Sequence, residues 1–261
     1  MSLQFRYNYL IEAAMEIVLK DVRVNYRKSG EQGAPVVLLH GWGQNIEMME
    51  LIEMHLMDAF QVYNIDLPGF GESEEPKTAW SVYDYEEWLE AFCEALDIEN
   101  PILICHSFGA RLGIIYASKN PVKKMVITGG AGIKDKHGLD YYTRVYSYKA
   151  AKKVLTVLHM DRTKEQLMRN AGSSDYKNTS GVKRETFVKV VNEDLSYLLS
   201  KVSCETLLVW GDKDEMTPLW MGQKMEKEMP NAGLAIFEGD DHFAYYHQMA
   251  RFLKVIDIFL R

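Results

Sequence analysis

The chain has 261 residues, 47% of them hydrophobic and 26% charged, which is enough to bury one large core. Its 37 acidic and 30 basic residues give a net charge of −7, which argues against a general affinity for the phosphate backbone of nucleic acids. No stretch approaches the ~20 apolar residues of a membrane span and no apolar signal core opens the chain, so we expect a cytoplasmic protein without nucleic-acid or membrane partners.

The N-terminal third begins with residues that have no clear periodicity, and we interpret residues 1–14 as an N-terminal extension or leader. From residue 15 to about residue 30, apolar and polar residues alternate, which predicts two short antiparallel strands. A turn at 31–34 leads into a buried strand, PVVLL, which leaves the sheet at His40-Gly41-Trp42-Gly43. Glycines at such an exit let the backbone approach a ligand closely.

A methionine-rich segment follows over 46–60, with apolar residues at helical spacing, and we interpret its methionines as core filling. The next strand is predicted at 61–66. The loop DLPGFGES, at 66–73, contains a proline and two glycines that specify a rigid turn. A helix is then predicted over about 82–96.

The stretch PILICHSFGAR, at 101–111, is typical of a buried strand, a sharp turn and a helix, with Ser107 at the turn. Such a turn leaves little room for side chains two positions on either side, at Cys105 and Gly109, and it pushes the serine hydroxyl out at the end of the sheet. Ser107 is therefore a candidate nucleophile. The alternative is a polar turn serine that merely follows a buried strand.

Residues 122–130 form a further predicted strand, so strands and helices alternate along this part of the chain. The alternation predicts an α/β fold with a mostly parallel central sheet and helices on both faces. Ligand sites in such sheets lie beyond the carboxyl ends of the strands, where we expect Trp42, Ser107 and Gly130.

The alternation stops at residue 131. The segment 131–203 is helical, tyrosine-rich and basic in pattern and has no convincing strand, so we interpret it as a helical cap inserted into a core formed by 15–130 and 204–261. The α/β pattern then resumes with a strand from residue 205, a helix over about 219–229, a strand AGLAIF and a closing helix that ends at 260.

The loops after these last two strands contain Asp214 and His242. A serine that transfers an acyl group needs a base that takes its proton and an acid that orients the base and stabilises its charge. His242 and Asp214 fit these two roles, with Ser107 as the nucleophile.

The three cysteines, Cys93, Cys105 and Cys204, are widely separated and have no CxxC spacing. Neither a disulfide framework nor a zinc site is indicated, and we expect reduced thiols, no metal and no cofactor.

Five motifs occur in chain order at predicted strand ends: HGWG, DLPGFGES, CHSFGA, WGDKDEMTP and GDDHF. Together they resemble the α/β-hydrolase superfamily over nearly the whole chain from residue 15. The resemblance implies the α/β-hydrolase fold with a helical cap and a serine hydrolase triad in the order Ser107, Asp214, His242. The sequence departs from the GxSxG elbow of the family at Cys105, which stands in place of the first glycine.

Two branches of the superfamily are similar to this chain. HGWGQN and DLPGFGES resemble the methyl esterases that act on a pimeloyl chain attached to acyl carrier protein. Those esterases usually have Gly, Trp and Ser around the elbow, whereas this chain has Cys105, His106 and Ser107. The resemblance therefore does not assign their substrate to this chain. The expected cap also resembles that of carbon-carbon bond hydrolases, and the motifs do not separate the two branches.

Each triad residue has rivals. The acid of the family stands three positions after the glycine of WGxxD, which selects Asp214 over Asp212. Asp240 and Asp241 directly precede His242 in an extended loop, where adjacent side chains point apart, so we interpret them as turn formers. Three other histidines are interpreted as structural residues behind the oxyanion loop, beside the nucleophile and in the last helix: His40, His106 and His247.

Acyl transfer also requires two backbone N–H groups that converge on the developing oxyanion. The resemblance assigns one to Phe108, directly after the nucleophile, and the other to Trp42, in the loop after the His-Gly pair.

The predicted function is a carboxylesterase that cleaves small to medium apolar acyl esters through an acyl-enzyme intermediate. The start of the expected cap contains four tyrosines: Tyr141, Tyr142, Tyr146 and Tyr148. Either some of them overhang the serine, with Tyr141 and Tyr146 as candidate substrate contacts, or they only fasten the cap to the core. Lys149, Lys152 and Lys153 either receive an acyl carrier protein or form a solvated helix face.

Three alternatives to the carboxylesterase stay open from the sequence. They are a slow or non-catalytic ligand-binding protein on a hydrolase scaffold, a carbon-carbon bond hydrolase, and a cofactor-free haloperoxidase that uses the same triad.

Overall fold

The computed structural model describes residues 14–134 and 179–261, together with eight isolated residues between them: 147, 151, 153, 155, 156, 160, 162 and 163. Residues 1–13 and the rest of 135–178 lie outside the described residues, and with them lie the expected leader, Tyr141, Tyr142, Tyr146, Tyr148, Lys149 and Lys152. Lys153 is described and exposed.

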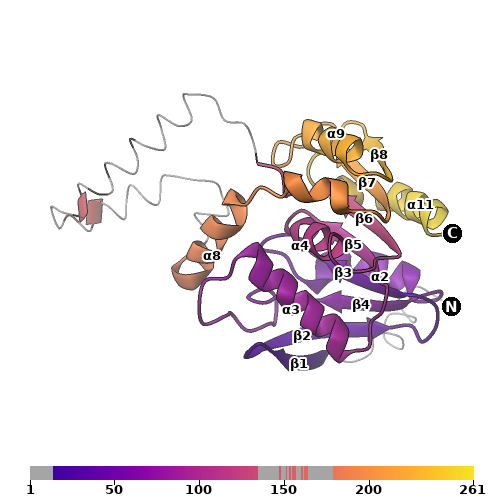
Figure 1. Ribbon diagram of the computed structural model, residues 1–261, viewed down its shortest axis with the longest axis horizontal. Coiled ribbons are helices and arrows are strands. Elements are labelled where there is room, and N and C mark those ends of the chain that lie inside the picture. The colour runs from indigo at the N-terminus through magenta and orange to yellow at the C-terminus, as the bar shows by residue number, and fades with distance from the viewer. Residues whose placement is uncertain are drawn as a thin grey trace.

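An eight-stranded sheet forms the centre of the molecule, in the order β1-β2-β4-β3-β5-β6-β7-β8. Figure 1 shows the strands stacked from β1 at the lower edge to β8 at the upper edge. The strands are β1 (Met15–Leu19), β2 (Val22–Ser29), β3 (Pro35–Leu39), β4 (Gln61–Ile65), β5 (Ile102–His106), β6 (Lys124–Thr128), β7 (Glu205–Gly211) and β8 (Ala232–Phe237). β2 pairs antiparallel with both β1 and β4, and all the other neighbours are parallel. The predicted α/β class and the mostly parallel sheet are confirmed.

Helices cover both faces of the sheet, which explains why the central strands are apolar on both sides. In β3, for example, Val37 and Leu39 belong to one core cluster, whereas Val36 and Leu38 belong to the other. The first cluster is closed by α3 (Val82–Ala95), α4 (Phe108–Ala117) and α9 (Leu219–Glu228). The second is closed by α2 (Glu50–Leu56), α10 (Ala244–His247) and α11 (Met249–Leu260).

The predicted helix over 46–60 and the predicted closing helix are each divided in the structure. The first is a 3-10 turn η1 (Ile46–Met49) followed by α2, because the Asn45 side chain accepts a hydrogen bond from the Glu47 backbone N–H and starts a tight turn there. Met49 is fully buried, as expected of a core-filling methionine. At the other end of the chain, α10 and α11 are separated at Gln248.

The segment expected to be a cap is described at 131–134, at 179–203 and at the isolated residues. Over 179–203 it forms α8 (Gly181–Asn192) and the 3-10 helix η2 (Ser196–Lys201). α8 is fixed to the core because the Thr186 hydroxyl accepts the Trp80 backbone N–H at 3.1 Å and the Phe187 ring packs on Trp42 at 5.1 Å. The division of the whole chain into a core and a cap stays a prediction.

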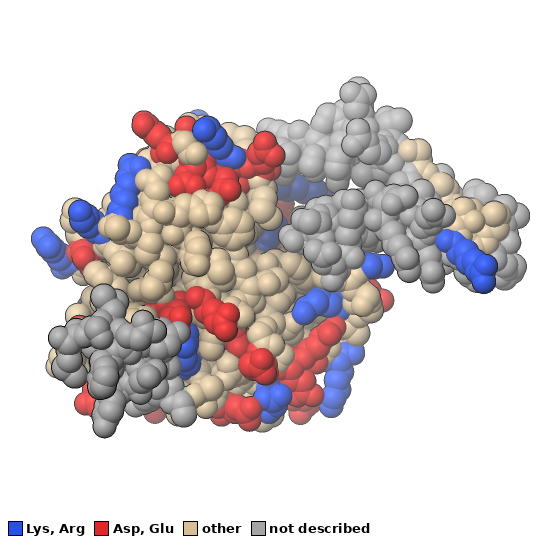
Figure 2. Space-filling view, turned by 180° about the vertical axis from the view of Figure 1, so that it is seen from behind, with Lys and Arg blue, Asp and Glu red and all other residues tan. Residues whose placement is uncertain are grey.

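The surface of the described residues carries charges of both signs. Figure 2 shows Lys and Arg side chains interspersed with Asp and Glu over one face. None of the described helices combines the length and the apolar character that a membrane crossing requires.

All three cysteines are free: Cys93 and Cys105 are buried and Cys204 is half-buried. Burial raises the pKa of the Cys93 thiol to about 11 and also raises the pKa of Cys105 and Cys204. These groups are therefore protonated, weakly nucleophilic thiols at neutral pH.

Cys105, the departure from the family elbow, is accommodated by a glycine in the next helix. A Cβ atom at Gly113 of α4 would lie 2.7 Å from the Cys105 Sγ, so the sulfur occupies space that Gly113 leaves free. The Cys105 side chain is thus accommodated where α4 packs on β5.

Gly113→Ala is expected to lower the free energy of unfolding, although Ala in place of Gly inside a helix ordinarily raises it by about 1 kcal/mol. The reason is the contact between the new methyl group and the Cys105 sulfur. In a Cys105→Ala background that contact is gone, and Gly113→Ala should become neutral or stabilising. Urea unfolding of the four proteins of this double-mutant cycle measures the coupling, for which we expect about 1–3 kcal/mol. Additive effects would contradict the packing argument.

Candidate active site

Ser107 lies at the junction of β5 and α4, with φ 48° and ψ −107°. A positive φ is rare for a residue with a side chain and marks a strained turn. The turn is held by backbone hydrogen bonds, because the Ser107 N–H donates to the Thr128 carbonyl at 3.1 Å and the Ser107 carbonyl accepts from Ala110 and Ala131. A Cβ atom at Gly109 would overlap the Leu39 carbonyl oxygen, so a glycine is required there. The sharp turn predicted from the sequence is present.

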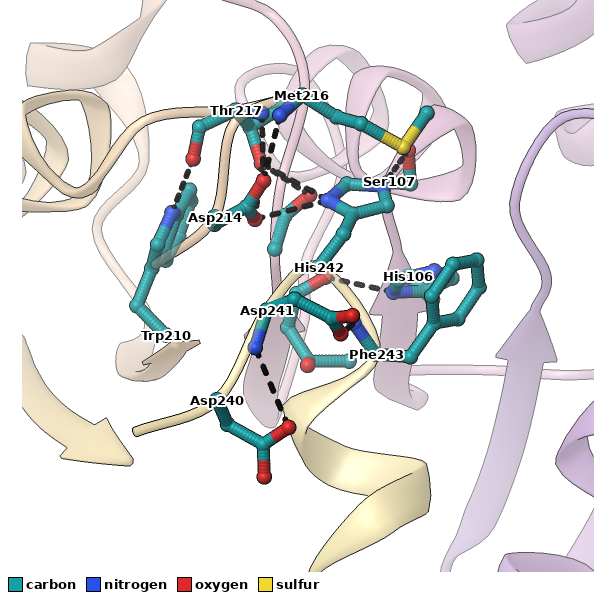
Figure 3. Close-up of polar contacts among 12 residues, drawn as sticks. His106, Ser107, Trp210, Asp214, Met216, Thr217, Asp240, Asp241, His242 and Phe243 are labelled. Carbon is teal, nitrogen blue, oxygen red and sulfur yellow. Dashed lines mark hydrogen bonds and ion pairs between the residues drawn. The ribbon is translucent and has the colours of Figure 1, made fainter. Parts of the chain in front are cut away.

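The structure brings Ser107, His242 and Asp214 together in one hydrogen-bonded chain, shown in Figure 3. The Nε2 atom of His242 lies 2.8 Å from the Ser107 Oγ, and its Nδ1 atom lies 2.8 Å from the Asp214 Oδ2. Because a carboxylate accepts the Nδ1–H, the Nε2 atom is left as the acceptor for the serine proton. The side chains of His242 and Asp214 are 5% and 0% exposed, so water does not compete for this bond.

Asp214 is held by three donors besides the histidine. Its Oδ1 accepts the backbone N–H groups of Met216 at 2.9 Å and Thr217 at 2.8 Å, and the Thr217 hydroxyl lies 2.8 Å from its Oδ2. Such donors fix the carboxylate in place. The Thr217 hydroxyl also lies 3.0 Å from the Gly129 carbonyl and 3.2 Å from the His242 Nδ1, so it ties the acid, the base and the end of β6 together.

Thr217 is a site residue that sequence reasoning missed. The signal was present in DEMTP, because an aspartate whose side chain accepts the N–H groups two and three residues on is a common turn device. The pattern predicts the turn, but it does not show that the Thr217 hydroxyl reaches the histidine.

The other acids of these loops hold the loops themselves, with Asp212 as a brace between two loops. Asp212 accepts the Gly239 backbone N–H at 2.7 Å, and Asp241 accepts the Phe243 backbone N–H at 2.9 Å. Asp240 lies 2.7 Å from the Nδ1 atom of His247. None of the three acids contacts His242 through its side chain among the described residues.

The remaining candidate bases lie outside the serine–histidine pair. His106 is fully buried with its Nδ1 atom 3.0 Å from the Thr128 carbonyl, and burial together with the neighbouring His242 holds its pKa well below the usual range. His40 places its Nδ1 atom 2.7 Å from the Gly41 carbonyl and accepts the Leu67 N–H at its Nε2 atom, and burial lowers its pKa to about 4. Both rings are therefore neutral near pH 7, and both pack behind the site.

The two residues expected to provide the oxyanion hole flank the serine. Phe108 is the first residue of α4, where the helix dipole favours negative charge, and Trp42 lies in the loop after β3. In the part of the chain that the structure describes, neither backbone N–H has a hydrogen-bond partner. The Trp42 ring packs on Phe108 at 5.3 Å and on Phe70 at 4.9 Å, which fixes the loop beside Ser107.

The loop DLPGFGES supports the oxyanion-loop region around Trp42 through the hydrogen bonds of Asp66. The Asp66 carboxylate accepts the backbone N–H of Ile46 at 2.8 Å and that of Glu72 at 3.0 Å, and it accepts the side-chain amide of Asn25 at 2.8 Å. A Cβ atom at Gly71 would overlap that carboxylate. The loop therefore shapes the site without contributing a reacting group, as its sequence predicted.

A cavity of about 510 Å³ opens over the serine. Its described lining is mainly aromatic and polar: Trp42, Gly43, Gln44, Phe70, Ser107, Thr179, Lys183, Met216, His242 and Phe243. Figure 3 shows the Met216 side chain extending toward Ser107. Four of these residues were not predicted as site residues: Gln44, Phe70, Met216 and Lys183. Their positions depend on how the loops and α8 dock on the sheet, which the sequence does not show.

Among the described residues, one group could offer three ligand atoms to a metal ion: Asp240, Asp241 and His247. Asp241 and His247 are exposed, and none of the three lines the cavity. The hydrogen-bonded chain from Asp214 to Ser107 does not depend on these residues.

A family model described as the alpha/beta hydrolase fold matches residues 34–149. This match and the mostly parallel sheet give the chain the α/β-hydrolase fold. A relative is the 2-hydroxy-6-oxononadienedioate/2-hydroxy-6-oxononatrienedioate hydrolase of Burkholderia vietnamiensis, which is 27% identical over 271 residues, covering 92% of each chain. The turn at Ser107, the loop after β3 and the position of Asp214 lie at strand ends, where the sequence motifs predicted them.

Solved structures show the same fold. An esterase from Exiguobacterium antarcticum superposes with a TM-score of 0.73 at 20% identity, covering 95% of this chain and 99% of that one. A meta-cleavage product hydrolase from Pseudomonas fluorescens IP01 superposes with a TM-score of 0.71 at 21% identity, covering 94% and 97%. At these identities the likeness concerns the fold alone.

The buried His40 is expected to make stability depend on pH. Its pKa is lowered from 6.5 to about 4 in the folded protein, so below pH 6.5 the unfolded chain takes up a proton that the native state does not. The stabilising contribution is complete above pH 6.5 and is lost as the pH falls toward 4. Between pH 7 and pH 5 the loss is on the order of 2 kcal/mol.

Urea unfolding at pH 7 and pH 5 of the wild type and of His40→Asn measures this contribution. The amide nitrogen of Asn takes the place of Nδ1 and does not titrate. The wild type should lose more stability than the variant over this interval, and equal losses in the two proteins would show that His40 is not the buried neutral imidazole described here.

Proposed function

We propose that the protein is a serine hydrolase that cleaves carboxylic esters of small to medium acyl groups through an acyl-enzyme intermediate. The observation that carries the proposal is the continuous chain from Asp214 through His242 to Ser107, with both links at 2.8 Å, at the base of a cavity. A turn serine without a catalytic role would need neither the strained backbone nor a buried acid behind the histidine.

In the proposed reaction, the Ser107 Oγ attacks the ester carbonyl carbon while the His242 Nε2 takes the hydroxyl proton. Asp214 keeps the imidazole in the required tautomer and stabilises the imidazolium. The oxyanion that forms on the carbonyl oxygen accepts hydrogen bonds from the N–H groups of Trp42 and Phe108. His242 then gives its proton to the departing alcohol, and a water molecule repeats the sequence on the acyl-enzyme to release the acid.

The cavity supports the proposed substrate size. Its volume of about 510 Å³ lies within the range of pockets for small molecules, and aromatic rings supply much of its lining. Such walls favour an apolar acyl chain, since burial of apolar surface contributes ~25 cal/mol per Å². The predicted substrate contacts Tyr141 and Tyr146 lie outside the described residues and stay predictions.

Carbon-carbon bond hydrolysis is the second candidate, and it is favoured by the Burkholderia relative, whose name gives a substrate cleaved by a hydrolase of that kind. The same serine, base and oxyanion hole would attack a ketone carbonyl in place of an ester. Comparison of kcat/KM for a p-nitrophenyl ester and for a 2-hydroxy-6-oxo dienoic acid separates the two candidates. A ligand-binding protein on this scaffold would turn over neither.

Ser107→Ala is expected to reduce kcat for p-nitrophenyl butyrate by about 10⁴ to 10⁶, because it removes the nucleophile. Circular dichroism and the melting temperature should stay close to those of the wild type, since the side chain is small and forms one hydrogen bond among the described residues. A variant that retains ester turnover would show that another group performs the attack.

The acid is tested by a matched pair in one loop. Asp214→Asn should reduce kcat severely, because the amide presents a donor where the Nδ1–H needs an acceptor, whereas Asp212→Asn should retain most of the activity. If Asp212→Asn were the more damaging change, the assignment of the acid would be wrong. The rate should also fall at acid pH, where a protonated imidazole cannot accept the serine proton.

A further inference from the structure

Helix α8 turns one face toward the core, and Lys183 belongs to that face. Thr186, Phe187 and Val190 follow it by three, four and seven residues, which is the spacing of a single helix face. All three are buried: the Thr186 hydroxyl bonds to the Trp80 N–H, and Phe187 packs on Trp42. The docking of α8 therefore directs Lys183 inward, onto the cavity over Ser107.

Lys183 is the cation in the described lining of that cavity. Its side chain is half-buried, and its Nζ atom lies 4.8 Å from the centroid of the Phe70 ring. Within the described ranges, no carboxylate forms an ion pair with it and none lines the cavity, whereas Lys119 and Lys20 each contact a glutamate. Among the described residues, this half-buried ammonium therefore faces an aromatic wall without a carboxylate partner.

The position of Lys183 in its helix is also unfavourable for helix stability. Lys183 stands in the first turn of α8, where the helix dipole disfavours a positive charge, and no acidic residue occupies that turn. Neither local helix stability nor an ion pair within the described ranges explains the cation there. An anionic group in the cavity would satisfy it, with an attraction stronger than at an open surface because the site is partly closed to water.

We propose that Lys183 binds a carboxylate at the far end of the acyl chain, so that the preferred substrates are monoesters of short dicarboxylic acids. This inference rests on the proposed ester hydrolase function and gives its substrate class. A single ammonium matches one monovalent carboxylate, whereas a phosphate dianion would bring a second charge into the aromatic cavity without a partner. Phe70 and Trp42 contact the methylene chain between the carboxylate and the scissile carbonyl.

The kinetic test uses two esters of nearly equal shape: mono-p-nitrophenyl adipate, which ends in a carboxylate, and p-nitrophenyl hexanoate, which ends in a methyl group. For the wild type, the ratio of kcat/KM for the adipate to that for the hexanoate should exceed one. In Lys183→Met, which keeps the apolar stem, the ratio should fall by about tenfold to a hundredfold, as expected for loss of a charge-assisted hydrogen bond. Lys183→Arg should retain most of the ratio.

Lys189→Met is the matched control. Lys189 lies on the same helix, is exposed, donates to the Ala79 carbonyl and does not line the cavity, so its replacement should leave the ratio as in the wild type. A ratio that falls equally in both lysine variants would reflect net charge alone. That result would overturn the assignment to Lys183.

A binding measurement separates this inference from the proposed function. In the Ser107→Ala background, monomethyl adipate should bind more tightly than methyl hexanoate by titration calorimetry, and Lys183→Met should abolish the difference. If the wild type hydrolyses neither ester, the proposed function is wrong, and the calorimetry still decides the role of Lys183. If both esters are hydrolysed but neither the ratio nor the binding responds to Lys183→Met, the lysine only covers Phe70 and the inference is wrong.

Discussion

The left-handed backbone at Ser107 is the constraint on which the rest of the site depends. It reverses the chain between β5 and α4 in a single residue, so that the hydroxyl and the N–H of Phe108 both face the region beyond the strand ends. The strain is balanced by packing that only this arrangement permits: Gly109 lies against the Leu39 carbonyl, and the Ser107 N–H bonds to Thr128 of the neighbouring strand. Changes that loosen α4 on β5 therefore act on the serine as well as on the fold.

The parallel sheet then brings three distant loops to the same edge. β5, β7 and β8 all end there, and the acid and the histidine follow β7 and β8 by three and five residues. The last two loops are packed directly together, because a Cβ atom at Gly211 would overlap the carbonyl oxygens of Asp240 and Asp241. Thr217 connects this pair of loops to Gly129 at the end of β6, so four neighbouring strands contribute to the position of one imidazole.

Much of this arrangement was predictable because it depends on short sequence patterns. The glycines at strand ends and the small residues around Ser107 follow from short-range sterics, whereas the choice of Asp214, three residues after Gly211, came from the resemblance to the family motif. Thr217 and Lys183 were not found for a different reason. The role of each depends on contacts between segments far apart in sequence. The Thr217 hydroxyl lies close to three groups from different loops, and Lys183 reaches the cavity only because α8 docks on the core. The segment predicted to be helical over 46–60 is helical from 46 to 56, but it begins as a 3-10 turn because the Asn45 side chain accepts the Glu47 N–H there.

The proposed function requires that His242 and Asp214 activate Ser107. The most direct measurement is reaction with a fluorophosphonate probe, followed by mass mapping of the labelled peptide in the wild type and in His242→Ala. We expect a label on Ser107 in the wild type and a loss of most of that labelling in the variant, because the serine then lacks its base. Labelling at another residue, or equal labelling of Ser107 in both proteins, would contradict it.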